Sequence, residues 1–152
     1  MVGADAATAG PPSAGVLVPG RSLGDLRLGM TLVQVEAAWG RAYGRCRSCA
    51  RPTLYFNLYA HRPEGAGVEL RRGRVSAVFT LWAPGAWQTT RGLRIGDSAA
   101  DATATYGPMK RTGCRGYHAL TLASRRTLTA VYVVGTEVWG FGLLAPDAPV
   151  CR

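Results

Sequence analysis

The chain has 152 residues and a net charge of +9, almost all of it from arginine, because Lys110 is its one lysine. A hydrophobic fraction of 47% excludes a disordered chain and predicts a packed globule of one domain, or of two half-size modules that share a core. No apolar stretch is long enough to be a transmembrane segment.

Residues 1–20 are rich in Ala, Gly and Pro, a composition typical of a flexible tail. After this tail comes the most informative pattern, an internal repeat in which residues 26–40 align without gaps with residues 93–107. Each copy has a Gly, a hydroxyl N-cap, a Gln or Asp three positions later and a final Gly, which together predict a short capped helix. These residues are Gly29, Thr31, Gln34 and Gly40 in the first copy and Gly96, Ser98, Asp101 and Gly107 in the second.

Apolar residues at helical spacing mark one face of each predicted helix. Leu32, Val35 and Trp39 form this face in the first copy, and Ala99, Ala102 and Tyr106 form it in the second. We expect these faces to pack on a sheet.

Runs of β-branched and aromatic residues follow each helix and predict strands. The expected strands are Thr53–Tyr59, Ala66–Leu70, Val75–Phe79, Tyr117–Ala123, Leu128–Tyr132 and Val138–Leu144. We therefore expect an α+β fold of two tandem repeats, each a short helical hairpin packed on an antiparallel sheet of three to four strands. The first repeat would span 21–88 and the second 89–152, with residues 83–90 as the linker.

The segment 28–40, which begins Leu-Gly-Met-Thr, resembles the helix signature of two related families. One is the small lipoprotein of the outer-membrane β-barrel assembly machinery, and the other is the secreted β-lactamase inhibitor protein of actinomycetes. The doubled arrangement with cysteines in each half is more similar to the inhibitor protein. The resemblance implies a tandem repeat whose concave sheet face holds a protein partner, and it carries over no individual contact residue.

The four cysteines are an even number, which permits two disulfides and is typical of a secreted or cell-envelope protein. Cys46 and Cys49 form a C-x-x-C motif that could be a redox pair or half of a zinc site. We expect a structural disulfide instead, because no second C-x-x-C exists and the motif lies in a loop rich in Gly and Arg. Cys114 would then pair with Cys151, although the other two connectivities remain open.

The sequence contains none of the common catalytic motifs, and His61 and His118 have no acidic or second histidine neighbour at ligand spacing. We therefore expect a non-enzymatic protein, without metal or cofactor, that binds another protein through the open face of its sheet. Alternation along the first strand puts Tyr55, Asn57 and Tyr59 on that face. Trp82 and Trp139 are further candidates.

Two alternatives remain. Arg41, Arg45, Arg47 and Arg51 surround the C-x-x-C loop and could bind an anionic polymer of the cell envelope. A sequence-specific nucleic-acid site is not expected, because no docking motif accompanies the arginines. The other alternative is a thiol-redox protein that uses Cys46 and Cys49.

Overall fold

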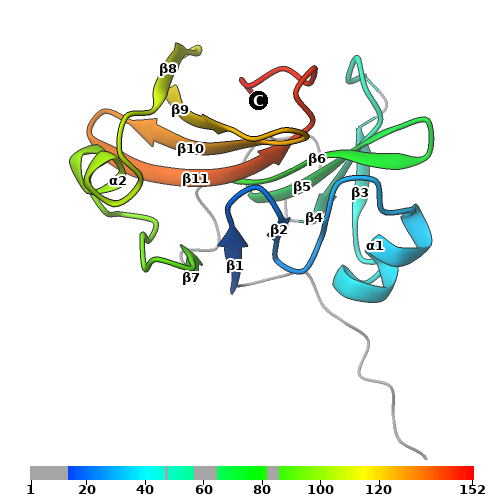
Figure 1. The fold of residues 1–152 in the computed structure, drawn as a ribbon. Coiled ribbons are helices and arrows are strands. Elements are labelled where there is room, and N and C mark those ends of the chain that lie inside the picture. The colour runs from blue at the N-terminus through cyan, green and yellow to red at the C-terminus, as the bar shows by residue number, and fades with distance from the viewer. Residues whose placement is uncertain (1–13, 47, 57–64, 82–85) are drawn as a thin grey trace, which may run out of the picture.

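One antiparallel sheet of eight strands organises the chain in the computed structural model, which describes residues 14–46, 48–56, 65–81 and 86–152 (Figure 1). The strand order is β3-β4-β5-β6-β11-β10-β9-β8, so the two halves of the chain meet where β6 pairs with β11. The strands are β3 (Gly44–Cys46), β4 (Thr53–Phe56), β5 (Gly65–Arg71), β6 (Arg74–Leu81), β8 (Lys110–Gly113), β9 (His118–Ala123), β10 (Leu128–Val134) and β11 (Glu137–Leu144).

Two eight-residue helices, α1 (Leu32–Trp39) and α2 (Ala99–Tyr106), lie on one side of this sheet (Figure 1). Both begin with the predicted capping box, in which the N-cap hydroxyl and the side chain three residues later each accept a backbone N–H. Both end at the predicted glycine, which has a positive φ. The predicted apolar faces are also confirmed, since all six of their residues pack into the core on this side.

The helices dock on the sheet in the same way in both halves. The backbone N–H of Gly29 donates to Val75 O at 2.8 Å, and that of Gly96 donates to Val138 O at 2.8 Å. These bonds attach the loop before each helix to the last strand that its own half contributes to the large sheet, β6 or β11.

The expected fold class is wrong, because the chain is mostly β. Each half contains one helix instead of a helical hairpin, since only a few residues separate the helix end from the next strand, β3 or β8. The strands form one sheet instead of two small ones. β6 and β11 are buried along nearly their whole length, as central strands covered on both faces are, and they pair with each other.

A second, three-stranded sheet on the helix side includes one strand from the expected tail and one from the expected linker. Its order is β2-β1-β7, from β1 (Ala14–Val18), β2 (Ser22–Leu23) and β7 (Ala86–Thr89). Trp87 of β7 is fully buried, with its ring centroid 6.0 Å from that of Trp39. Gly15 makes room for Trp87, because a Cβ at that position would lie 2.3 Å from a ring carbon.

The sheet has an apolar core on each side. One core lies beneath the helices and the small sheet, and the other lies on the opposite side. Residues 145–152, here called the C-terminal strap, run over this second side (Figure 1). The strap begins directly after β11, where Ala145 N donates to Ser76 O at 2.8 Å.

Candidate functional site

The C-terminal strap is fastened to the sheet by polar contacts and a disulfide. Arg152 forms an ion pair with Glu69 of β5, and the two side chains are only 6% and 3% exposed. The hydroxyl of Tyr132 donates to Val150 O at 2.7 Å, and that of Tyr117 donates to Arg152 O. Cys151 is bonded to Cys114. The strap therefore covers the central part of the face that was expected to be open.

Tyr55, the predicted binding residue on β4, lies on the side of the sheet that the strap covers. The predicted alternation is right, since Leu54 and Phe56 pack on the helix side and Tyr55 on the strap side. The expected exposure of Tyr55 is wrong, because it is only 7% exposed. Asn57, Tyr59, Trp82 and Arg47 lie outside the described residues.

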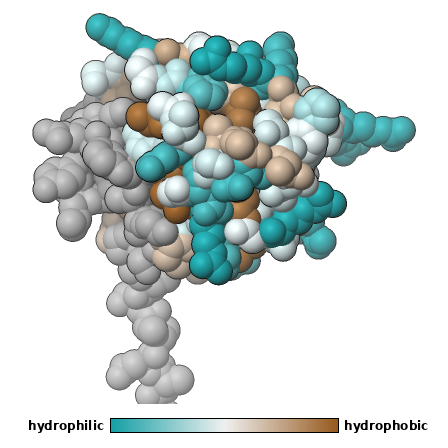
Figure 2. Space-filling view, turned by 90° about the vertical axis from the view of Figure 1, so that its left-hand side faces the viewer, coloured by the Kyte–Doolittle hydropathy of each residue, from teal (hydrophilic) through white to brown (hydrophobic). Residues whose placement is uncertain are grey.

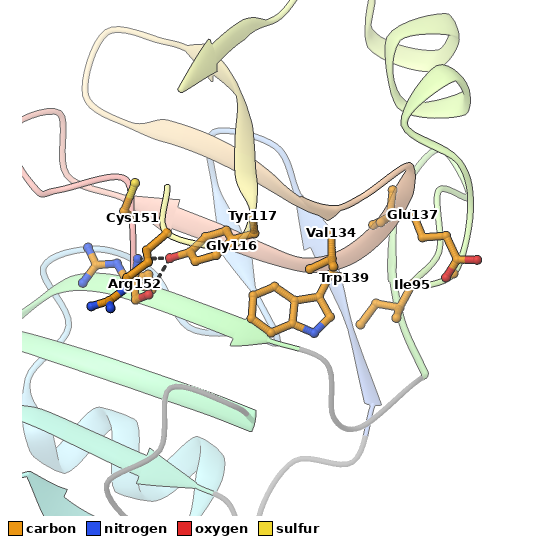
Figure 3. A pocket seen from close by; sticks show the side chains of 11 residues that line it. Ile95, Gly116, Tyr117, Val134, Glu137, Trp139, Cys151 and Arg152 are labelled. Carbon is orange, nitrogen blue, oxygen red and sulfur yellow. Dashed lines mark hydrogen bonds between the residues drawn. The ribbon is translucent and has the colours of Figure 1, made fainter. Parts of the chain in front are cut away.

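The strap side carries a recess at one end, beside the turn between β10 and β11. We call it the aromatic recess; it has a volume of about 720 Å³. Its walls include Ile95, Arg115, Tyr117, Val134, Glu137 and Trp139 (Figure 3). The rings of Tyr117 and Trp139 lie 5.3 Å apart, centroid to centroid, at an angle of 58°. The sequence-predicted residue Trp139 is thus part of a concave, mainly apolar site.

A β-bulge places Trp139 in this recess. Tyr132 pairs with Gly140 and the next residue, Val133, pairs with Val138, so the register between the two strands shifts at Trp139. Bulges change the direction of a side chain and increase the local twist. β6 has a bulge at the equivalent place, because Glu69 pairs with Ala77 and Leu70 pairs with Val75, so the register shifts at Ser76. The hydroxyl of Ser76 donates to Glu69 O.

Charged residues lie at opposite ends of the recess. Figure 3 shows Arg152 beside Tyr117 at one end and Glu137 at the other, with Trp139 between them. Burial raises the pKa of Tyr117, which keeps its hydroxyl protonated as the donor to Arg152 O. A ligand in the recess would therefore meet the ring of Tyr117 and not a free hydroxyl.

Figure 2 views the molecule from the side of α2 and the β10–β11 turn. Apolar residues reach the surface there in separate spots between hydrophilic ones. Val134, at the end of β10, is one of the large apolar residues on the surface, with 42% of its area exposed.

Three of the arginines around the C-x-x-C loop, Arg41, Arg45 and Arg51, have partners within the chain. Arg51 Nε lies 2.9 Å from Glu69 Oε1, and Arg41 Nε lies 3.2 Å from Glu36 Oε2. The guanidinium of Arg45 lies over the ring of Tyr43, 5.6 Å from its centroid. The two ion pairs, of Arg41 and Arg51, reduce the positive charge available to an anionic polymer.

The expected disulfide pairing is confirmed, with Cys46 bonded to Cys49 and Cys114 to Cys151. Cys49 and Cys151 line one small cavity of about 170 Å³, together with Arg51, Glu69 and Arg152. Over the described ranges, no group of three or more His, Cys, Asp or Glu residues is arranged to hold a metal. Neither helix of the described chain is long and apolar enough to cross a membrane.

Glu69 joins the two disulfide segments by pairing with Arg51 and Arg152, a role that was not predicted from the sequence. The available signal was a single carboxylate within the apolar run Gly65–Leu70, because a charge inside a buried strand needs a partner. The recess residues Ile95, Tyr117 and Val134 gave no comparable signal, since they lie in three separate segments that meet only in the folded chain.

No model of a known protein family matches the sequence, and no curated protein matches it either. The structure is similar to a crystal structure of an extracellular protein containing a SCP domain from Bacillus anthracis str. Ames, with a TM-score of 0.54 at 9% identity. The match covers 78% of this chain and 44% of that one, so this chain spans less than half the length of that protein. At this identity the likeness shows the fold alone. The two disulfides agree with an extracellular location.

Proposed function

We propose that this chain is a non-enzymatic, extracytoplasmic binding protein that holds apolar side chains of a protein partner in the aromatic recess. The observation that carries the proposal is the recess itself, a concavity of about 720 Å³ with Tyr117 and Trp139 in its walls. Its volume is within the range of about 300–1,000 Å³ that is usual for binding pockets.

The composition of the recess favours a protein partner. Partly exposed aromatic side chains contribute strongly to protein interfaces, because they bury a large apolar area and lose little conformational entropy. Arg115 and Glu137, with opposite charges and both exposed, lie at its edge. Such a pair would orient a partner that carries complementary charges.

Binding of an anionic polymer has less support. Arg41 and Arg51 form ion pairs with carboxylates of the chain, and Arg45 lies over Tyr43. A polymer would have to compete with these partners, and binding of that kind would weaken with salt.

The proposal can be tested by capturing partners on the immobilised, oxidised protein from culture-fluid and envelope extracts, with elution along a salt gradient. The Val134→Asp variant places a charge at the edge of the recess, and Trp139→Ala removes one of its walls. Val33→Asp is the matched control, because Val33 is 73% exposed on α1, on the other side of the sheet.

We expect the wild type and Val33→Asp to retain the same discrete protein at high salt. Val134→Asp and Trp139→Ala should lose it. Equal retention of the partner by all four proteins would contradict a role of the recess in binding. Elution of only an anionic polymer at moderate salt would favour the alternative, in which the arginines around the C-x-x-C loop bind that polymer.

A further inference from the structure

The two disulfides meet at the small cavity although their segments are far apart in the sequence. Cys49 and Cys151 both line this cavity. Cys46 is buried at 8% exposure, whereas Cys49 is partly exposed, so an external thiol reaches the C-x-x-C pair most readily at Cys49. Cys49 Sγ also lies 3.7 Å from the hydroxyl oxygen of Tyr55. One cysteine of each disulfide therefore lines the same solvent-open cavity.

The charges around the cavity favour a thiolate. Arg51 follows Cys49 by two residues, Arg152 follows Cys151 directly, and both guanidinium groups pair with the single carboxylate of Glu69. Two positive charges against one negative charge leave a net positive environment. A positive environment stabilises the thiolate form of cysteine, which is the form that attacks a disulfide.

We propose that Cys49 and Cys151 exchange disulfide bonds, so that the C-x-x-C pair passes reducing equivalents from an external dithiol to the disulfide that fastens the C-terminal strap. This inference does not rest on the proposed binding function, because it concerns a different cavity and a covalent reaction.

The exchange takes three steps. An external dithiol first reduces the Cys46–Cys49 bond and is itself oxidised to a disulfide, leaving both cysteines as thiols. The Cys49 thiolate then attacks Cys151 Sγ, the Cys114–Cys151 bond breaks, and Cys114 leaves as a thiolate that takes up the proton lost by Cys49. Cys46 finally attacks Cys49 Sγ, which reforms the Cys46–Cys49 disulfide and releases Cys151 as a thiol.

Release of the strap would change the surface of the protein. The strap packs over buried aromatic residues of the sheet, among them Tyr55 and Tyr132. Cys151 and Arg152 also line the aromatic recess. Reduction would therefore uncover apolar surface and remove one wall of the recess.

The direct test uses the double variant Cys46→Ala/Cys114→Ala, which leaves Cys49 and Cys151 as the two cysteines. Mild oxidation of the folded protein should join them, and peptide mapping by mass spectrometry without reduction detects the bond. The matched control, Cys49→Ala/Cys114→Ala, leaves the buried Cys46 with Cys151 and should cross-link far less. Absence of the Cys49–Cys151 bond in a protein with a native circular dichroism spectrum, or equal cross-linking in the control, would overturn the proposal.

A second measurement keeps the proposal testable if these variants do not fold. The wild type and Cys46→Ala/Cys49→Ala are exposed to about 0.1 mM dithiothreitol, and the free thiols are alkylated over time. Because an internal thiol acts at an effective concentration in the millimolar range, the Cys114–Cys151 bond should open about tenfold more slowly in the variant. Equal rates in the two proteins would also overturn the proposal.

Discussion

Gly67 of β5 has a steric role that its sequence position does not reveal. A Cβ at this position would lie 2.3 Å from Cζ of Phe79 on the neighbouring strand. We expect Gly67→Ala to lower the free energy of unfolding by about 1–3 kcal/mol, because the ring must leave its packed position. Gly113→Ala in β8 is the control, since no atom lies within 4 Å of its added Cβ. Urea unfolding of the oxidised proteins measures both effects, and equal midpoints would contradict the clash.

Glu69 joins the strap to the sheet through a buried ion pair with Arg152. Removing one partner of a buried pair leaves the other charge without compensation, so Glu69→Gln should lower the free energy of unfolding by about 3 kcal/mol. The control is Asp147→Asn, because Asp147 forms an exposed ion pair with Arg71 and its loss should have no measurable effect. Similar unfolding midpoints for the two variants would show that Glu69 is not a structural link.

His118 should make stability depend on pH. Burial, and then the positive charge of Arg111, lower the pKa of His118 in the folded protein. The unfolded chain then binds the proton more readily, so the stability due to neutral His118 is present above the unfolded pKa of about 6.5 and is lost as the pH falls through the folded pKa. Between pH 7 and pH 5, unfolding free energy should fall more steeply for the wild type than for His118→Gln. Parallel curves would contradict this assignment.

The two helix caps act at the level of the element, where the hydroxyls of Thr31 and Ser98 each accept a backbone N–H. Thr31→Ala and Ser98→Ala should each lower stability by about 1 kcal/mol, because each leaves a helix N–H without its partner. Thr31→Ser keeps the hydroxyl and should remain near wild type. Thermal unfolding measures the series, and a Thr31→Ser protein as unstable as Thr31→Ala would rule out the cap as the cause.

Local signals predicted the helices well, because a capping box and a terminal glycine act within a few residues of sequence. The strand runs were also readable, and six of the eight strands in the large sheet overlap the expected ranges. The strands β3 and β8 were missed because they are short and polar edge strands. The parallel pairing of β1 with β7 joins segments about seventy residues apart, a contact that no local pattern encodes.

The candidate site was less predictable than the fold for the same reason. Trp139 was named from its type and strand position, but the bulge that directs it into the recess depends on pairing with β10. Tyr55 was assigned to the correct face, and its exposure was wrong because the strap, distant in sequence, packs on that face. The strand face of a single residue could therefore be predicted from the sequence, but the distant segments that pack around it could not.

For the whole molecule, the two halves form one continuous sheet with a different cover on each side. Helices and a small sheet cover one side, and the C-terminal strap covers the centre of the other. The aromatic recess lies at one end of the strap side, bounded by the loop before α2, the β8–β9 loop, the β10–β11 hairpin and the strap. This arrangement makes the strap a part of the recess wall, because Cys151 and Arg152 line the recess.

Site-specific photo-cross-linking tests the recess most directly. A benzoyl-phenylalanine at position 134 or, as the control, at position 33 would be irradiated in culture-fluid extract, and cross-linked proteins would be identified by mass spectrometry. We predict one discrete partner at position 134 and none at position 33, with competition by unlabelled wild-type protein and not by Val134→Asp. Cross-links that are equal at the two positions, or a partner that forms at position 33 alone, would contradict binding through the aromatic recess.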